Sequence, residues 1–246
     1  MLRLLLVAMV VATLASSLFV VAPYYPTETY APIVRSADPP SWQPVTPKLV
    51  VEAEHSMKVA LTFDAASWPA LQPAILDALR GAGVRCTMFL TGDFVDMYPE
   101  EVVQMAKDGH EIGNHSNTHR DMPSISSPEM VAELDDFDSK VVALTGKSTR
   151  PWFRPPSGSY NDRVIEVAAQ RGYYTIYWTA DSGDWRNDVE AATVKQRLLR
   201  YATPGAILVA HLTSPQTAEV LPEVLDVLKG RGVEFSTVSE LLGNLD

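Results

Sequence analysis

The sequence predicts an α/β domain built on a parallel sheet, and three observations support this fold class. Short apolar runs rich in β-branched and aromatic residues alternate with amphipathic segments from residue 57 onward. The alternation continues over about 190 residues, a length suited to one α/β domain. The amphipathic segments carry residues typical of helix starts and ends. An open doubly wound sheet and a closed barrel both fit this pattern.

Residues 1–22 form the first segment and indicate a signal peptide or a single membrane anchor. Arg3 is the only charged residue before Glu28, and the residues from Leu4 to Ala22 are almost wholly apolar. A helix of this length is about 28 Å long, which also just spans a bilayer. A cleaved signal and an uncleaved anchor both fit, and both predict an extracytoplasmic protein.

Residues 23–54 form a second segment that is rich in proline and has no sustained hydrophobic period. Proline at this density removes backbone donors and favours extended chain, so we expect a linker here. Its aromatic residues include Tyr24, Tyr25 and Trp42, which could dock on the domain or on another surface. The catalytic-sized domain is therefore expected at residues 55–246.

Composition excludes several classes of protein. The chain has 20 Lys and Arg against 30 Asp and Glu, so its net charge of −10 repels phosphate backbones and argues against nucleic-acid binding. The hydrophobic fraction of 46% is too high for a disordered chain. Cys86 is the one cysteine, which excludes an intrachain disulfide framework and a cysteine-rich zinc site. Any metal must therefore be held by His, Asp or Glu.

The individual elements follow from these patterns. Six strands are expected at 57–63, 84–90, 110–114, 151–154, 173–179 and 206–210. The clearest helix is expected at residues 128–145, with Ser127 as its N-cap, Pro128 at its first position and Gly146 after its end. Two further helical patterns run up to Gly81 and Gly230.

Polar residues gather where the predicted strands end. They are Asp64, His115, His119, Arg154, Asp181, Asp184 and His211. Barrels and open α/β sheets collect their active sites at the C-terminal ends of strands. Because five separate segments obey this rule, the pattern favours an enzyme over a structural module.

Each residue taken alone also has a structural explanation. The two histidines could be surface or capping residues, Asp64 could cap the next helix, and His211 could be a satisfied histidine at a strand end. Together, three imidazoles, two carboxylates and an arginine are the groups that metal-assisted hydrolysis needs. In such a reaction a carboxylate takes a proton from water, and an imidazole donates one to the departing amine.

Five motifs in order resemble those of the NodB-type polysaccharide deacetylases, carbohydrate esterase family 4. They are Thr62-Phe63-Asp64, His115-Ser116-Asn117-Thr118-His119, Arg154-Pro155-Pro156-Ser157-Gly158, Asp181-Ser182-Gly183-Asp184-Trp185 and Leu208-Val209-Ala210-His211. The resemblance extends from about Met57 to Leu242. It implies a distorted (β/α) barrel of seven or eight strands and a metal-dependent hydrolase that removes N-acetyl groups from aminosugars.

The resemblance also implies a role for each matching residue. Asp64 resembles the catalytic base, Arg154 the group that orients it and keeps it ionised, His211 the general acid and Asp184 the partner of that imidazole. An arginine lowers the pKa of a neighbouring carboxyl and a carboxylate raises that of an imidazole, so base and acid can both be ready near neutrality. Tyr160, Trp185 and Pro155 resemble substrate-binding residues, and flat aromatic rings suit sugar faces.

The metal site departs from the family pattern. His115 and His119 resemble the metal ligands, but the family's second aspartate, which completes the metal triad, is replaced by Ala65. Two imidazoles should hold Zn²⁺ or Co²⁺ more weakly, unless Asp64 or water supplies the missing ligand. An aspartate followed by two small residues and a tryptophan also resembles the sporulation-associated, deacetylase-like branch of the family.

The leading hypothesis is an exported, membrane-tethered, monomeric N-deacetylase acting on cell-wall polysaccharide, with peptidoglycan ahead of chitin oligomers. One rival is a catalytically degenerate deacetylase that binds glycan without hydrolysing it. Ala65 favours this rival, because loss of the metal-binding aspartate is expected to reduce the deacetylase activity. Another is a metal-dependent hydrolase of a different N-acyl or amide substrate. Retention of Asp64, Arg154, Asp184 and His211 favours an active enzyme.

Overall fold

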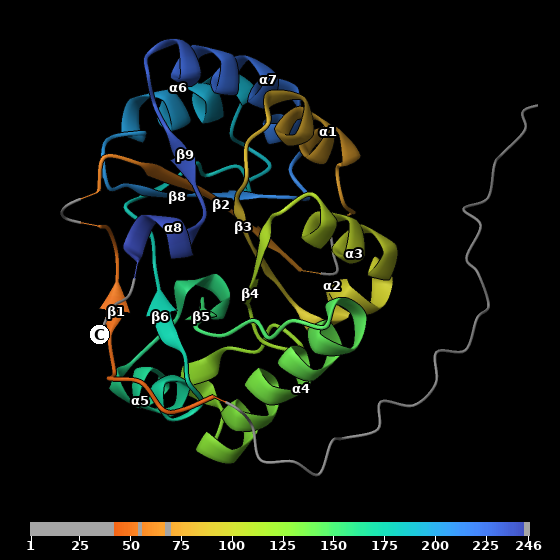
Figure 1. Cartoon of the computed structure of the whole chain (residues 1–246), viewed down its shortest axis with the longest axis vertical. Helices are drawn as coiled ribbons and strands as arrows, with labels where there is room; N and C mark the ends of the chain where they lie inside the picture. The colour runs from red at the N-terminus through yellow and green to blue at the C-terminus, as the bar shows by residue number, and fades with distance from the viewer. Residues whose placement is uncertain (1–41, 54–55, 67–69, 244–246) are drawn as a thin grey trace, which may run out of the picture. The chain divides into compact units, whose positions relative to one another are not determined.

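A computed structural model describes residues 42–53, 56–66 and 70–243 of the chain (Figure 1). The predicted signal or anchor at residues 1–22 and most of the predicted linker lie outside this part. Within the described residues, no helix has both the length and the apolar character needed to cross a membrane.

A parallel sheet of nine strands forms the centre of the described fold. The strands are β1 (Leu49–Val50), β2 (Val59–Ala65), β3 (Thr87–Leu90), β4 (Glu111–Asn114), β5 (Trp152–Phe153), β6 (Tyr174–Ile176), β7 (Ala180–Asp181), β8 (Ile207–His211) and β9 (Phe235–Ser236). Their order is β1-β6-β5-β4-β3-β2-β8-β7, and β9 pairs with β2. The sheet curls into a partial barrel (Figure 1), which confirms the distorted barrel that the family resemblance implies, with nine strands in place of seven or eight. A bridge between Glu52 and Ala206 links the segment after β1 to the start of β8.

Helices surround the curled sheet (Figure 1). They are α1 (Pro73–Ala82), α2 (Gly92–Met97), α3 (Pro99–Lys107), α4 (Ser127–Thr145), α5 (Asp162–Gln170), α6 (Ala191–Tyr201), α7 (Pro215–Gly230) and α8 (Val238–Leu242), with short 3₁₀ turns η1 (Met122–Ser124) and η2 (Pro156–Gly158). The main core lies between sheet and helices, where Phe63 and Met88 pack with Ile75 and Leu225.

Strand β2 shows how the sheet aims its side chains. All seven of its residues are buried. Side chains alternate along a strand, so Leu61 and Phe63 enter the main core. Thr62 and Asp64 point the other way, and both contact Arg154. The last polar residue of this apolar strand therefore faces the interior of the barrel.

Helix α4 corrects one detail of the sequence analysis. Its N-cap is Ser126 and not Ser127, because the Ser126 hydroxyl accepts a hydrogen bond from the Glu129 amide while the Glu129 carboxylate accepts one from the Ser126 amide. This reciprocal capping box satisfies two donors at the helix start. The predicted end is confirmed, since Gly146 adopts a left-handed φ of 71° after the last turn.

Residues 42–53 belong to the fold although the sequence analysis assigned them to a linker. Strand β1 pairs with β6, and the amide of Val45 donates to the carbonyl of Ala169 at 3.0 Å. The Trp42 ring lies 4.4 Å from the guanidinium groups of both Arg150 and Arg171. Proline-rich chain can still pair at the edge of a sheet, and the fold therefore begins before residue 55.

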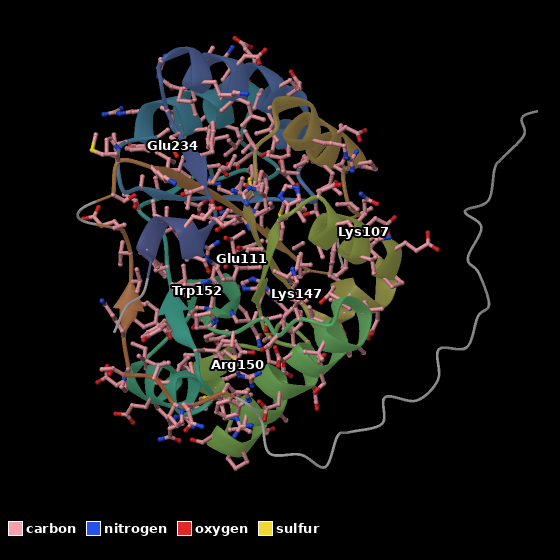
Figure 2. The ribbon with its side chains drawn as sticks, viewed as in Figure 1. Lys107, Glu111, Lys147, Arg150, Trp152 and Glu234 are labelled. Atoms are coloured by element: carbon pink, nitrogen blue, oxygen red, sulfur yellow. The ribbon has the colours of Figure 1, made fainter. Side chains whose placement is uncertain are left out.

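The Trp42 contacts lie where β5 and β6 begin, at the N-terminal edge of the sheet. Arg150, labelled in Figure 2 with Trp152, lies two residues before the start of β5, and Arg171 lies three residues before the start of β6. At the same edge, the indole N–H of Trp152 donates to Glu111 at 3.0 Å and to Ser239 at 2.7 Å. Helix α8 is thereby joined to the strand starts.

Candidate active site

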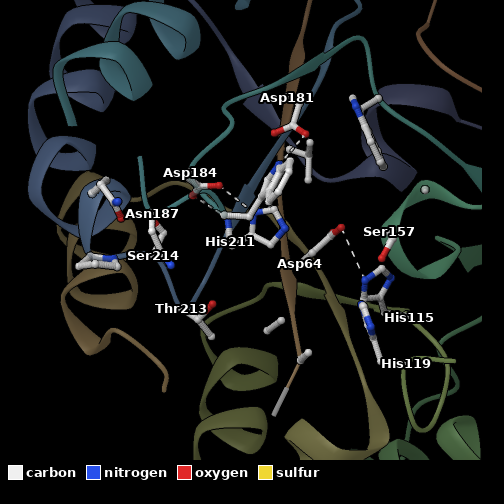
Figure 3. A pocket seen from close by; sticks show the side chains of 18 residues that line it. Asp64, His115, His119, Ser157, Asp181, Asp184, Asn187, His211, Thr213 and Ser214 are labelled. Atoms are coloured by element: carbon white, nitrogen blue, oxygen red, sulfur yellow. Dashed lines mark hydrogen bonds and ion pairs between the residues drawn. The ribbon is translucent and has the colours of Figure 1, made fainter. Parts of the chain in front are cut away.

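A pocket of about 600 Å³ lies at the C-terminal ends of the central strands. Seven of the residues singled out from the sequence line it, namely Asp64, His115, His119, Asp181, Asp184, Trp185 and His211. Figure 3 shows His211 on one side of Asp64, with His115 and His119 on the other. The strand-end pattern in the sequence therefore corresponds to one site in space.

Asp64 and Arg154 form a buried ion pair at the base of the pocket. Arg154 Nη1 donates to Asp64 Oδ1 at 2.7 Å and to the Thr62 hydroxyl at 2.8 Å, while Nη2 donates to the carbonyl of Tyr177 at 3.0 Å. The arginine is fully buried, and its guanidinium lies 4.1 Å above the Phe89 ring. Burial alone would raise the pKa of Asp64, but the Arg154 charge and the nearby imidazoles outweigh it and hold the pKa below its usual value.

His211 and Asp184 form a second pair on the other side of the pocket. His211 Nδ1 lies 2.7 Å from Asp184 Oδ1, and the His211 amide donates to Asp184 Oδ2 at 2.9 Å. The hydroxyl of Thr217 also donates to Asp184. Burial alone would lower the pKa of His211, but the Asp184 carboxylate outweighs it and raises the pKa above its usual value. Because Nδ1 is bound to Asp184, Nε2 is the nitrogen left to carry a proton toward substrate.

His115 presents its other nitrogen to the site. Its Nδ1 lies 2.8 Å from the carbonyl oxygen of Arg154, which fixes the tautomer with the proton on Nδ1. Nε2 then lies 3.8 Å from Asp64 Oδ2. Burial lowers the pKa of His115 to about 4, although Asp64 opposes the shift. The ring is therefore neutral near pH 7 and has a free lone pair.

His119 completes the imidazole pair. Its ring centroid lies 5.1 Å from that of His115. Burial also lowers the pKa of His119 below its usual value. Two neutral imidazoles on one side of Asp64 suit a divalent metal by their chemistry.

The third ligand position is where the site departs from a complete metal centre. Ala65 lines the pocket and is 1% exposed, but its methyl group offers no donor. Among the described residues, no group of three His, Cys, Asp or Glu side chains is placed to hold a metal ion. The imidazoles of His115 and His119 suit a divalent metal by their chemistry, and in this arrangement Asp64 is not placed as a third ligand beside them.

The predicted substrate-binding residues are placed differently from one another. Trp185 lines the pocket, is 62% exposed, and donates from its indole N–H to Asp181 at 3.2 Å. Tyr160 does not line the pocket, and its ring centroid lies 5.6 Å from that of Tyr177. Pro155 is buried at the start of η2 and does not line the pocket either.

Trp178 is a pocket residue that the sequence analysis missed. Its ring stacks on that of Tyr177 at 3.9 Å with an angle of 11°. A Cβ on Gly158 would lie 2.6 Å from Trp178, so only glycine lets this turn approach the ring pair. The sequence analysis placed Trp178 inside a strand, but β6 ends at Ile176. Trp178 therefore obeys the same strand-end rule as Asp64 and His211.

Comparison with known proteins agrees with this geometry. The family model for "Polysaccharide deacetylase" matches residues 52–176. Over 186 residues the chain is 32% identical to peptidoglycan-N-acetylmuramic acid deacetylase PdaA of Bacillus subtilis, covering 75% of this chain and 71% of that protein. The chain belongs to the polysaccharide deacetylase family.

Solved structures of this polysaccharide deacetylase family include active and inactive members. The structure of Bacillus subtilis PdaA, a family 4 carbohydrate esterase, superposes with a TM-score of 0.74 at 30% identity, covering 79% of this chain and 84% of that one. The structure of the family 4 pseudoenzyme BA3943 of Bacillus anthracis superposes with a TM-score of 0.72 at 31% identity, covering 80% of this chain and 69% of that one. A mutant of BA3943 is described as having restored enzymatic activity. Membership in the polysaccharide deacetylase family is therefore compatible with either an active or an inactive site.

Proposed function

We propose that the protein is a metal-dependent N-deacetylase that removes acetyl groups from aminosugars of cell-wall peptidoglycan. The observation that carries this proposal is the pairing of Asp64 with Arg154 and of His211 with Asp184 around one pocket. A related family member is named for N-acetylmuramic acid in peptidoglycan and another for N-acetylglucosamine. These names favour peptidoglycan over chitin oligomers as the substrate.

Asp64 is the base in this proposal. Its Oδ1 accepts from Arg154, so Oδ2 is the oxygen available to take a proton from the attacking water. The lowered pKa keeps the carboxylate ionised near neutrality. Arg154 donates to the Thr62 hydroxyl and to the Tyr177 carbonyl, and these contacts fix its guanidinium. Arg154 therefore both orients the Asp64 carboxylate and keeps it ionised.

His211 is the acid. Its raised pKa keeps the ring protonated to higher pH than a free imidazole, and Asp184 holds it through Nδ1. As the carbon–nitrogen bond of the acetamide breaks, Nε2 donates a proton to the departing amine. Water oxygen is added to the acetyl carbon, so the products are acetate and a free amino sugar.

His115 and His119 are the residues that would hold a divalent metal such as Zn²⁺ or Co²⁺. When bound, a metal of this kind polarises the acetyl carbonyl as a Lewis acid. The hydrogen bond from His115 Nδ1 to the Arg154 carbonyl links this side of the site to the base. Since Ala65 supplies no ligand, we expect weak metal binding and reduced activity at low metal.

A second candidate function is glycan binding without hydrolysis. Ala65 favours it, because the complete family site has an aspartate at this position, and so does the similarity to the BA3943 pseudoenzyme. The four intact residues Asp64, Arg154, Asp184 and His211 favour the enzyme. A site that had lost its chemistry would have little need for two buried, hydrogen-bonded charge pairs.

The proposal includes an extracytoplasmic, monomeric protein held at the membrane by residues 1–22. The apolar run after Arg3 supports it. Cell fractionation followed by N-terminal sequencing tests it, and we expect the intact chain in the membrane fraction. A soluble form that starts near Ser17 or Pro23 would instead show a cleaved signal.

Acetate release tests the catalytic proposal. The full-length protein is incubated with peptidoglycan and with chitin oligomers, with and without added Zn²⁺ or Co²⁺, and His211→Ala serves as the inactive control. We expect acetate from peptidoglycan that rises with added metal. No acetate under metal excess, combined with retention of the protein on insoluble peptidoglycan, would support the glycan-binding function.

A further inference from the structure

Glu133 is a buried carboxylate on α4 that contacts the loop between His115 and His119. It is 8% exposed. Its Oε2 accepts from the amides of Asn117 at 2.8 Å and Thr118 at 2.7 Å, and its Oε1 accepts from the Thr118 hydroxyl at 2.6 Å. In the part of the chain that the structure describes, no ion pair is found for this carboxylate. All three hydrogen bonds therefore reach into one loop.

Two residues of that loop have backbone conformations that residues with a side chain rarely adopt. Ser116 has a φ of 70° and His119 a φ of 57°. These left-handed values are uncommon for residues with a side chain, so the loop needs partners outside itself to hold them. The spacing of the two histidines alone does not fix where their rings point.

Other backbone groups of the loop are held by different partners, among them the His119 amide, which donates to the Ser116 hydroxyl at 3.0 Å. The amides of Gly92 and Asp93 at the start of α2 donate to the carbonyls of Ser116 and Asn117 at 3.1 and 3.0 Å. Asn114 accepts from the Ser116 amide at 2.9 Å. Helix α2 thus binds the loop's carbonyls, and Glu133 binds the two amides at its centre.

We propose that Glu133 is a positioning residue that fixes the loop so that both imidazoles face the same metal. It touches neither substrate nor metal, and the inference rests on the proposed metal site. An ionised carboxylate suits this task because hydrogen bonds to a charged acceptor are shorter and stronger than neutral ones. Removal of the charge should let the central amides move and separate the two rings.

Asp138 provides a matched control on the same helix. It too is 8% exposed, and it accepts from the amide and hydroxyl of Thr149 at 2.7 and 2.8 Å, in addition to an ion pair with Arg150. None of these partners belongs to the histidine loop. Glu133→Gln and Asp138→Asn therefore both remove a buried charge from α4, but only the first alters the loop.

The test is a Co²⁺ titration of the full-length protein, followed by calorimetry and by the visible absorption of the bound ion. We expect Glu133→Gln to bind Co²⁺ about 10- to 100-fold more weakly and with an altered spectrum, as changes around metal ligands typically do. Asp138→Asn should keep the wild-type affinity and spectrum. Thermal unfolding of the metal-free proteins shows how much of each effect is lost stability.

Three outcomes would overturn the inference. They are a wild-type Co²⁺ affinity and spectrum in Glu133→Gln, equal losses in both variants, and a wild-type protein that takes up no Co²⁺. If Glu133→Gln does not fold, Thr118→Val removes one of the three hydrogen bonds, and an unchanged affinity there decides against the inference. A wild type that binds Co²⁺ but releases no acetate, with weaker binding in Glu133→Gln, would reject deacetylation and support the role of Glu133.

Discussion

Asp64 and His211 are register partners on neighbouring parallel strands, β2 and β8. The amide of Leu212 donates to the carbonyl of Asp64 at 3.1 Å, which continues the ladder just beyond the pair. Adjacent strands lie about 4.8 Å apart, and paired residues point to the same face of a sheet. The proposed base and acid are thus placed side by side by the hydrogen-bonded pairing of β2 with β8.

Asp64→Asn tests the base. The amide keeps the shape of the side chain but cannot take a proton at neutral pH, so acetate release should fall by at least about 100-fold. Loss of the charge beside fully buried Arg154 should also reduce the free energy of unfolding, by up to about 3–5 kcal/mol. Steady-state kinetics and urea unfolding measure the two effects. Activity within a few-fold of wild type would assign the proton transfer to another group.

The pH profile of kcat/KM tests the pair as a unit. Activity needs Asp64 ionised, His115 neutral and His211 protonated, so the alkaline limb should lie above the usual imidazole pKa of 6.5. Asp184→Asn removes the charge that raises the pKa of His211, so it should move the alkaline limb to lower pH. An alkaline limb that does not move would show that His211 is not the acid.

The same shifts affect stability. His211 has a raised pKa in the folded protein, so its contribution is complete below its unfolded pKa and is lost as pH rises through the folded value. Asp64 has a lowered pKa, so its contribution is present above its unfolded pKa and is lost as pH falls through the folded value. Urea unfolding of wild type and Asp184→Asn across the alkaline range should show the His211 contribution only in the wild type. Parallel curves for the two proteins would contradict this assignment.

Ala65→Asp tests the missing ligand. Ala65 ends β2, and its carbonyl accepts from the Thr91 amide at 3.1 Å, so the position is fixed beside the pocket. If an aspartate there reaches the metal, Zn²⁺ affinity should rise by about 10- to 100-fold, and deacetylation at low metal should rise with it. Calorimetric titration measures the affinity. Ala66→Asp, which adds the same charge to the next pocket residue, is the control.

Equal Zn²⁺ affinity in the wild type and Ala65→Asp would mean that the site does not use this position. Because Ala65 is also part of the main core, a clash of the larger side chain is the alternative cause of failure. The temperature of unfolding separates the two explanations. A variant as stable as wild type but unimproved in affinity would exclude the clash.

Trp178→Ala tests the pocket wall. Removal of the ring that stacks on Tyr177 should weaken glycan binding by about 3- to 10-fold, since aromatic contacts contribute on this scale beyond simple burial. Binding of soluble glycan fragments can be followed calorimetrically. Tyr201→Ala, an exposed aromatic residue on α6, should bind glycan as the wild type does. Equal binding in both variants would exclude Trp178 from the substrate surface.

The sequence predicts those strands whose own residues form a recognisable run. The runs that contain β2, β3 and β8 are apolar and bounded by polar or breaker residues, and all three strands are observed. Strands β1, β7 and β9 have two residues each. They lie outside the expected runs, so only the neighbouring strand determines that they pair, whereas β5, which also has two residues, lies within the expected run at 151–154. The pairing of β1 with β6 cannot be read from proline content, so the sequence places the start of the domain too late, at residue 55.

Some residues of the candidate site can be predicted from the sequence, and others cannot. Asp64, His115 and His211 follow apolar runs, so their common edge can be predicted from the order of the chain. Glu133 cannot be found in this way, because it lies inside a helix and gains its role only when α4 packs beside a loop more than ten residues earlier. Thr217, which donates to Asp184, is likewise brought to the site by the packing of α7.

The contact of Trp42 with Arg150 and Arg171 shows at which edge of the sheet the described fold starts. This contact lies at the edge where the strands begin, and the pocket opens at the edge where they end. Residue 42, where the described part of the chain starts, therefore lies at the edge remote from the pocket. A glycan strand that binds at the pocket would therefore lie at the opposite edge of the sheet from Trp42.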